Sequence, residues 1–121
     1  MDSVLQNTRR HDIAFHRDGR IDITASVSKA LGLACGDVID IAYDKTGCYL
    51  YVKFHRAYGR HEAMVYRPCR RGTSLRCSSV RLYQYFTRLC NSDVPVFRFC
   101  VGDAVTINDV IYLPIITKLK L

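Results

Sequence analysis

Apolar and polar residues alternate along two stretches near the start of the chain. Residues 12–16 alternate first, the Arg-Asp-Gly sequence at 17–19 supplies turn chemistry, and residues 20–24 alternate again. A period of two is typical of a strand with one buried face, and a glycine-containing turn between two such runs favours a hairpin. The pattern therefore predicts a hairpin with Ile21 and Ile23 on its buried face.

After this hairpin the apolar spacing becomes helical. Val27 and Leu31 are four residues apart, Thr24 or Ser26 can cap the first turn, and Gly32 can end the last one. Small polar residues accept hydrogen bonds at helix starts, and glycine adopts the left-handed conformation at helix ends. We expect a helix of about two turns.

Two further apolar runs, at 38–43 and 48–54, flank the Asp-Lys-Thr-Gly sequence at 44–47 and predict a second hairpin. The stretch 55–62 is polar and basic and contains a glycine, which is typical of a linker. We therefore divide the chain into a tail (1–11), a strand, helix and hairpin unit (12–54), a linker (55–62) and a second unit (63–121). With 121 residues in all, the two units are expected to share one core.

The second unit shows a similar order of patterns. It predicts a strand at 63–67, a turn at 68–72, a strand at 73–77, a helix from Ser78 or Ser79 to Cys90–Asn91, and strands at 94–101, 104–107 and 110–116, with Pro114 favouring a sheet edge. The expected fold class is α+β, mainly β, with two short helices.

Similarity between the two units suggests an internal repeat. Ile21 and Ile23 correspond to Leu75 and Cys77, whereas the run 36–41 resembles 102–107 at a different offset. Two explanations remain open, a tandem repeat and chance alternation in an α+β chain.

A resemblance to a known superfamily rests on two runs, which are Gly19-Arg20-Ile21-Asp22-Ile23-Thr24-Ala25-Ser26-Val27-Ser28-Lys29-Ala30-Leu31-Gly32-Leu33 and Gly36-Asp37-Val38-Ile39-Asp40-Ile41. A Gly-Arg turn, alternating aliphatics, a short helix, Leu-Gly-aliphatic and Gly-Asp before an aliphatic strand resemble the AbrB/MazE/MraZ pattern. The resemblance covers about a third of the chain, residues 12–54 in our division.

The resemblance implies a small swapped-hairpin barrel, built either by a homodimer or by two tandem copies in one chain. It also implies DNA binding, and the positions that match the family's basic residues here are Arg20 and Lys29. The chain departs from the pattern at Thr24 and Ser28, where the family often has proline and a basic residue.

The charge distribution adds candidate binding residues outside the run that carries the resemblance. Lys and Arg number 18 against 11 acidic residues, a net charge of +7, and between residues 53 and 88 nine basic residues accompany only Glu62. Such a belt attracts polyanions through phosphate contacts and counterion release, although a merely solvated surface would look similar. The candidate nucleic-acid-binding residues are Arg17, Arg20, Lys29, Arg70, Arg71, Arg76 and Arg81.

No catalytic or cofactor motif is present, and neither the histidines nor the six cysteines have metal-ligand spacing. We therefore expect no enzyme, no cofactor and no metal, and we expect the cysteines to be free thiols. Cys69, beside Arg70 and Arg71, is the best candidate for a reactive thiol. Polar residues 1–10 lack the apolar run of a secretory signal, which favours a cytoplasmic location.

Two functions fit these features. The first is a DNA-binding protein, a transcriptional regulator that contacts phosphates of double-stranded DNA through a basic face. The second is a protein-interaction module, such as an antitoxin-like partner or a phage or mobile-element factor, whose positive face meets an acidic protein.

Overall fold

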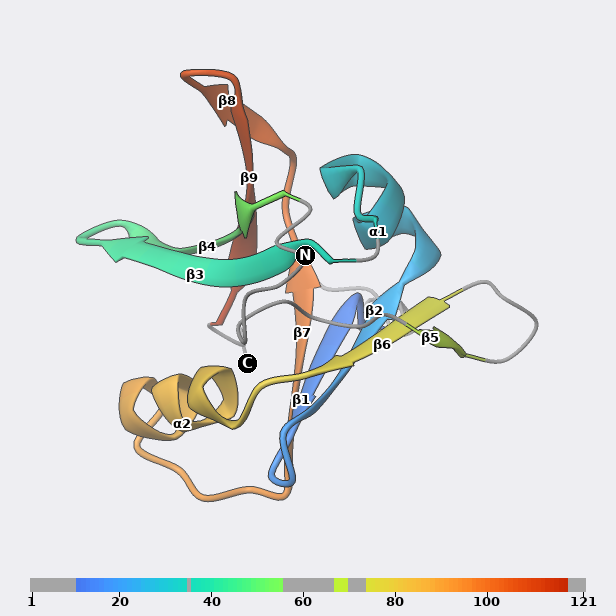
Figure 1. Ribbon diagram of the computed structural model, residues 1–121. Coiled ribbons are helices and arrows are strands. Elements are labelled where there is room, and N and C mark those ends of the chain that lie inside the picture. The colour runs from blue at the N-terminus through green and yellow to red at the C-terminus, as the bar shows by residue number, and fades with distance from the viewer. Residues whose placement is uncertain (1–10, 35, 56–66, 70–73, 118–121) are drawn as a thin grey trace, which may run out of the picture.

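The computed structural model describes residues 11–34, 36–55, 67–69 and 74–117. This part of the chain is mainly β, with two helices (Figure 1). The elements are β1 (Ile13–His16), β2 (Arg20–Thr24), α1 (Ala25–Leu31), β3 (Val38–Asp44), β4 (Gly47–Phe54), β5 (Arg67–Cys69), β6 (Ser74–Ser78), α2 (Val80–Leu89), β7 (Val96–Val101), β8 (Val105–Ile107) and β9 (Val110–Ile116).

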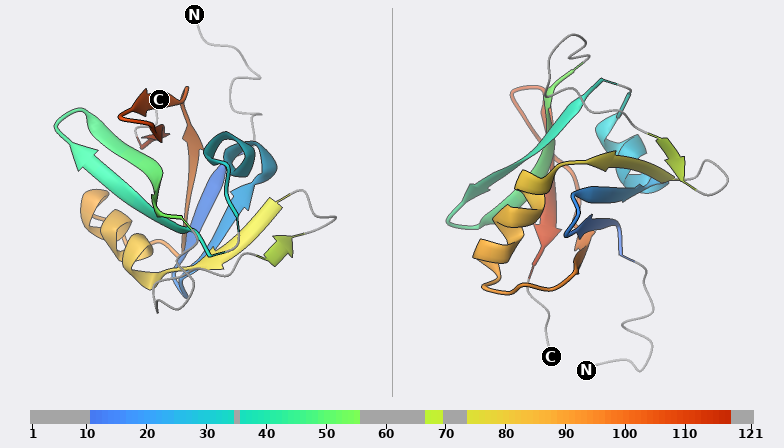
Figure 2. Two further views of the ribbon diagram at one scale, coloured as in Figure 1. Left: turned by 45° about the horizontal axis from the view of Figure 1, so that its top comes forward. Right: turned by 60° about the horizontal axis from the view of Figure 1, so that its bottom comes forward.

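The strands form one curled antiparallel sheet, a half-barrel that wraps around the core (Figures 1 and 2). Their order is β3-β4-β9-β7-β1-β2-β6-β5, and β8 pairs with the first part of β9. Strands distant in sequence are therefore neighbours, since β1 lies between β2 and β7 while β2 lies between β1 and β6. The sheet joins the first unit to the second along three ladders, β1 with β7, β2 with β6, and β4 with β9.

The first unit has the predicted elements. The turn between β1 and β2 places Gly19 at φ +99°, a conformation that residues with a side chain rarely adopt. A Cβ there would also lie 2.8 Å from Val80 Cγ2, so glycine is required for space as well. Thr24 is the N-cap residue of α1, but its side chain does not make the expected capping hydrogen bond, and its hydroxyl instead lies 3.2 Å from that of Ser26. Gly32 ends the helix in the left-handed conformation at φ +64°. The hairpin of β3 and β4 is also confirmed.

In the second unit the helix and most strands are confirmed, and two details of the prediction are wrong. Ser79 caps α2, with its hydroxyl accepting from the Leu82 N–H at 3.4 Å. However, Pro68 and Cys69 lie in β5, where a turn was expected, because they pair with Leu75 and Ser74. The predicted tail up to residue 10, the linker from residue 56, and positions 63–66 and 70–73 lie outside the described residues.

Pro114 does not lie on a sheet edge. It belongs to β9, which runs between β4 and β7, and it pairs with Tyr49. Its carbonyl accepts a hydrogen bond from the Gly102 N–H at 2.8 Å, one residue past the end of β7. The side of Pro114 that lacks an N–H therefore faces Gly102, where the β7 ladder ends. An interior strand tolerates a proline at such a position.

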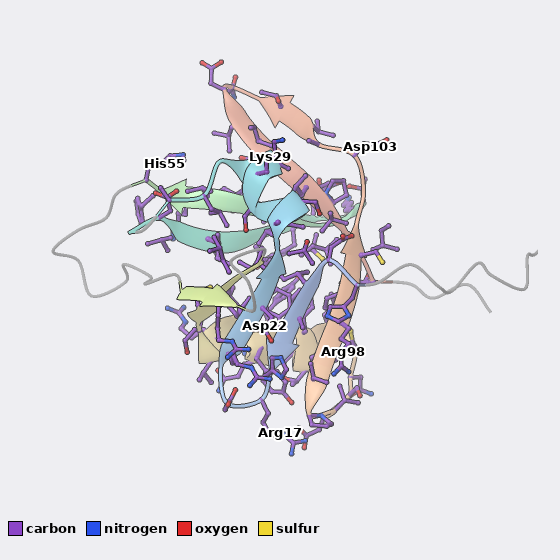
Figure 3. The ribbon with its side chains drawn as sticks, turned by 90° about the vertical axis from the view of Figure 1, so that its right-hand side faces the viewer. Arg17, Asp22, Lys29, His55, Arg98 and Asp103 are labelled. Atoms are coloured by element: carbon purple, nitrogen blue, oxygen red, sulfur yellow. The ribbon has the colours of Figure 1, made fainter. Side chains whose placement is uncertain are left out.

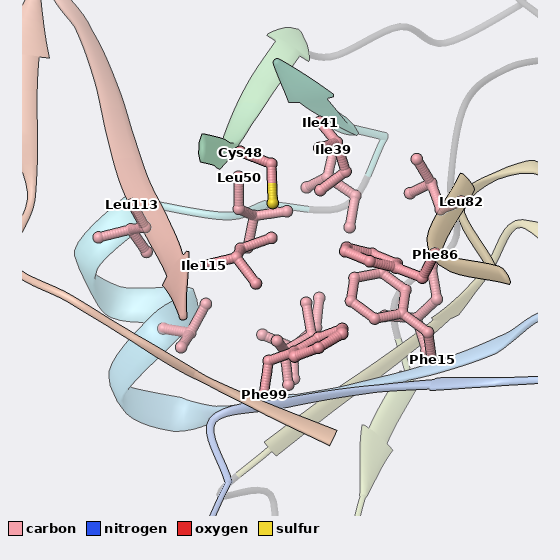
Figure 4. Close-up of a cluster of buried hydrophobic side chains, with 14 of the residues drawn as sticks. Phe15, Ile39, Ile41, Cys48, Leu50, Leu82, Phe86, Phe99, Leu113 and Ile115 are labelled. Carbon is pink, nitrogen blue, oxygen red and sulfur yellow. The ribbon is translucent and has the colours of Figure 1, made fainter. Parts of the chain in front are cut away.

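A single hydrophobic cluster draws on both units (Figure 4). Phe15 of β1 and Phe86 of α2 are both fully buried, with ring centroids 4.7 Å apart, and Phe99 of β7 lies 4.6 Å from Phe86. Burying one such side chain contributes about 1.5–3 kcal/mol. The cluster therefore contains residues from both sides of the linker that the sequence predicts.

The strand order has an internal regularity. If β1, β2, β3 and β4 are exchanged with β5, β6, β7 and β9, six of the seven neighbouring pairs along the sheet map onto pairs that are also present. The pair β1 and β7 has its counterpart in β5 and β3, which are not paired in the described part of the chain. At the centre of the β2–β6 ladder, Asp22 lies opposite Arg76.

Candidate nucleic-acid interface

Charged residues form a row across the outer face of the sheet. The register places Arg98 of β7 opposite Ala14 of β1, Ala14 opposite Asp22 of β2, and Asp22 opposite Arg76 of β6. The backbone register continues to Arg67 of β5, which is paired with Arg76. Side chains alternate between the two faces of a strand, and the residues that flank Asp22 in β2 and Arg98 in β7 are buried in the core. The charged side chains of this row therefore face outward, whereas Ala14 between them is buried.

Asp22 lies at the centre of this row and holds two arginines. Its Oδ1 accepts from Arg76 Nε at 2.7 Å, and its Oδ2 lies 3.4 Å from Arg20 Nε. Partial burial by itself would raise the pKa of the Asp22 carboxyl, but hydrogen bonds from Arg76 and His16, with the charges of Arg76 and Arg20, outweigh burial and lower it. Asp22 is therefore a carboxylate that holds Arg76 by a hydrogen bond and attracts Arg20 by its charge, although Arg20 Nε itself makes no hydrogen bond.

His16 completes the cluster at the end of β1. Its Nε2 lies 3.0 Å from Asp22 Oδ2, and Arg20 Nη2 lies 3.2 Å from both ring nitrogens. The side chains of Arg20 and Arg76 remain 42% and 43% exposed, so both are held in place and still reachable from solvent. We call His16, Arg20, Asp22, Arg76 and Arg98 the outer basic face.

Arg98 differs from the other two arginines of this face. It is exposed, and it forms no ion pair within the part of the chain that the structure describes. The outer basic face therefore holds three arginines against one carboxylate. Such an excess favours an anionic ligand, and the planar arginine fork suits phosphate oxygens.

Arg17 lies in the turn between β1 and β2, beside the loop that follows α2. Its Nη2 donates to the Asp93 carbonyl at 2.7 Å and lies 3.3 Å from the Asp93 carboxylate. A hydrogen bond with Tyr83 and the charge of Asp93 raise the pKa of Arg17. This arginine extends the outer basic face at one end, although its charge is partly offset by Asp93.

The structure brings together only part of the predicted set. Arg20 and Arg76 belong to one cluster and Arg17 adjoins it, whereas Arg81 lies on α2 and Lys29 on α1. In Figure 3, Lys29 and Arg17 lie toward opposite ends of the molecule, with Asp22 and Arg98 between them. Arg70 and Arg71 lie outside the described residues.

The prediction missed His16, Asp22 and Arg98. Alternation in β1 and β2 already assigns His16 and Asp22 to the solvent face of their strands, so this signal was present in the sequence. Arg98 joins them only because β7 pairs with β1, a contact between residues about 80 positions apart that local patterns do not reveal.

The described residues also bear on the expectations for metal sites and cysteines. No group of three or more His, Cys, Asp or Glu side chains in the described ranges is placed to hold a metal ion. Cys48, Cys77 and Cys90 are free thiols, as expected, and burial raises the pKa of the Cys77 thiol to about 12. The side chain of Cys69 is not described. Within the same ranges, no helix has the length and apolar character needed to cross a membrane.

Comparison of the chain with models of known protein families, with curated proteins and with solved structures gives no match.

Proposed function

We propose that this protein binds double-stranded DNA through the outer basic face and acts as a transcriptional regulator. The observation that carries the proposal is the cross-strand row in which Arg98 and Arg76 flank Asp22, with Arg20 and His16 beside it. Guanidinium groups held by a carboxylate lose little conformational freedom when they meet phosphates. Phosphate contacts of this kind position a protein on a duplex and supply most of its affinity.

The proposal includes a finer view of the fold. We infer that the sheet is a swapped-hairpin barrel of AbrB-like type formed by two tandem units, with β2 and β6 as equivalent strands. The near-invariance of the strand order on exchange of the two units supports this view, as does the match of Ile21 and Ile23 with Leu75 and Cys77 at a constant offset. In this arrangement Asp22 and Arg76 lie at the centre, so the duplex meets the molecule near its pseudo-twofold axis.

The first experiment measures duplex binding by fluorescence anisotropy between about 50 and 200 mM salt. We expect affinity to fall steeply with salt, with a log–log slope of about −0.9 for each phosphate contacted. Arg98→Gln is the sharpest variant, because Arg98 forms no ion pair among the described residues and its loss leaves Asp22 with its partners. It should weaken binding to all sequences alike and reduce the slope by about one contact.

Lys45→Gln is the matched control. Lys45 is exposed in the turn between β3 and β4, away from the outer basic face, and its replacement changes the net charge by the same amount. If both variants weaken binding equally, binding depends only on the net charge, which would contradict the proposed site. If no duplex binds at low salt and the protein instead recovers one stoichiometric acidic partner, the function is that of a protein-interaction module.

A further inference from the structure

The helix α2 has one apolar side and one polar side. Leu82, Tyr83 and Phe86 face the core and are buried. On the opposite side Arg81, Gln84 and Arg88 are exposed at positions i, i+3 and i+7, and Asn91 follows in the next turn. This spacing places the first three along a single stripe of the helix, which we call the α2 stripe.

The composition of the α2 stripe suits nucleic acid. No acidic residue occurs anywhere in α2, whereas an ordinary solvated helix face mixes charges of both signs. Arginine pairs with phosphate or guanine, and glutamine and asparagine amides pair with adenine. The nearest carboxylate along the chain is Asp93, which Arg17 contacts.

Arg81 is also unfavourably placed for stability. It occupies the second position of α2, and the N-terminal end of a helix carries a partial positive charge that repels a cation. Arg88 in the last turn is favourably placed. A cation that opposes the helix dipole is better explained by a ligand than by the stability of the fold.

The dimensions and rigidity of α2 suit a groove. Its ten residues span about 15 Å, and Arg81 and Arg88 are separated by about 10 Å along the axis, which fits a major groove about 12 Å wide. Hydrogen bonds from its N-cap residue and its first turn fix the helix to neighbouring segments. The Ser79 N–H donates to the Gly19 carbonyl at 2.8 Å, and the Tyr83 hydroxyl donates to the Val94 carbonyl at 2.5 Å.

The α2 stripe and the outer basic face point away from each other. Phe86 of α2 packs against Phe15 on the inner side of β1, so the core lies between the helix and the outer face of that strand. Figure 3 shows the same arrangement, with α2 behind β1 and β2 when Arg98 and Asp22 are nearest the viewer. A straight duplex lying on one surface therefore cannot reach the other.

We propose that α2 enters the major groove of a second duplex, so that one molecule bridges two DNA segments. The inference rests on the proposed function for the outer basic face and adds a second site of different character. The outer basic face supplies phosphate contacts, and the α2 stripe adds amides that can read base edges. Bridging would bring two distant stretches of one DNA molecule together.

The test is a capture assay. One short duplex is immobilised, the protein is added, and a second, fluorescent duplex of the same sequence is applied in excess. The wild-type protein should retain the fluorescent duplex. The double variant Arg81→Gln, Arg88→Gln should still bind a single duplex by anisotropy but lose most of the capture, whereas Lys45→Gln should keep both.

The outcomes separate the two proposals. Failure of the wild-type protein to bind any duplex overturns the proposed function. Binding of one duplex without capture of a second overturns bridging alone. Capture that survives the double variant also overturns it, since bridging would then arise from self-association. Circular dichroism of the double variant should match the wild type, because Arg81 and Arg88 have no role in the core.

Discussion

At the scale of single residues, Asp22 links the stability of the protein to its proposed ligand. It is the one carboxylate of the outer basic face, and it contacts Arg76, Arg20 and His16. A carboxylate among arginines reduces the local positive potential, and it also holds the guanidinium groups where a phosphate can meet them. The first effect weakens the binding of a phosphate and the second strengthens it.

The pKa of Asp22 gives a pH-dependent prediction. Because the pKa is lowered in the folded protein, its contribution to stability is present above the ordinary value of 3.8 and is lost as the pH falls through the folded-state value. Asp22→Asn should therefore lower the free energy of unfolding by about 1–2 kcal/mol at pH 7, and the difference should shrink below about pH 4.

Urea unfolding at pH 7 and pH 3 measures this difference. Asp103→Asn serves as the control, since Asp103 is exposed in the loop between β7 and β8. A difference that stays constant with pH would show that the Asp22 carboxylate is not engaged by its neighbours in solution.

At the scale of elements, the turn between β1 and β2 is docked against the start of α2. Gly19 and Gly32 are both left-handed, but only Gly19 lacks space for a Cβ, since nothing lies within 4 Å of that position at Gly32. Gly32→Ala should cost about 1 kcal/mol, the usual strain of a left-handed alanine. Gly19→Ala should cost clearly more, about 2–3 kcal/mol, because Val80 must also move.

Equal losses in the two glycine variants, measured by urea unfolding, would show that the turn and α2 are not in tight contact. The comparison is well matched because both substitutions add the same methyl group to a backbone of the same hand.

Local signals predicted most elements but not their partners. The helix ends at Gly32 and Ser79 and the alternation in β1 to β4 depend on neighbouring residues, so the sequence displays them directly. The error at Pro68 arose because proline is typical of turns, and only the pairing with Leu75 places it in a strand. The candidate site was harder to predict because it also depends on long-range pairing, which brings Arg98 and Arg76 close to Asp22.

The suspected repeat rested on two matches that need different offsets. The run 36–41 was matched with 102–107, but Asp37 is buried ahead of β3, whereas Asp103 is exposed between β7 and β8. The strand order instead places β7 in the position equivalent to β3. The two Gly-Asp sequences therefore lie in different surroundings, and Gly-Asp occurs in loops of many kinds.

At the scale of the whole molecule, Phe86 connects the two units. It is fully buried, and its ring lies within 4.7 Å of Phe15 and Phe99 between centroids, so it touches both β1 and β7. Phe86→Ala should lower the free energy of unfolding by about 3–5 kcal/mol. Phe86→Leu, whose side chain fills most of the space left by the phenylalanine, should lower the free energy of unfolding by less than about 2 kcal/mol. This variant still tests the contact if the alanine variant does not fold.

Leu89→Ala is the control on the same helix, since Leu89 is 49% exposed and its loss should change stability by less than about 0.5 kcal/mol. Thermal unfolding of the three variants gives the comparison. A Phe86→Ala variant as stable as Leu89→Ala would mean that α2 does not pack on the sheet.

The place of β1 in the sheet has a consequence for how the protein is made. One of its neighbours, β7, is synthesised about 80 residues later, so Phe15 has no aromatic partner on the ribosome until most of the chain has emerged. The nascent first unit then carries an unpaired strand edge and exposed apolar side chains, features that attract chaperones and promote aggregation. The pairing of β1 has to await the synthesis of β7, and the yield of folded protein in a cell should depend on that interval as well as on the stability of the folded state.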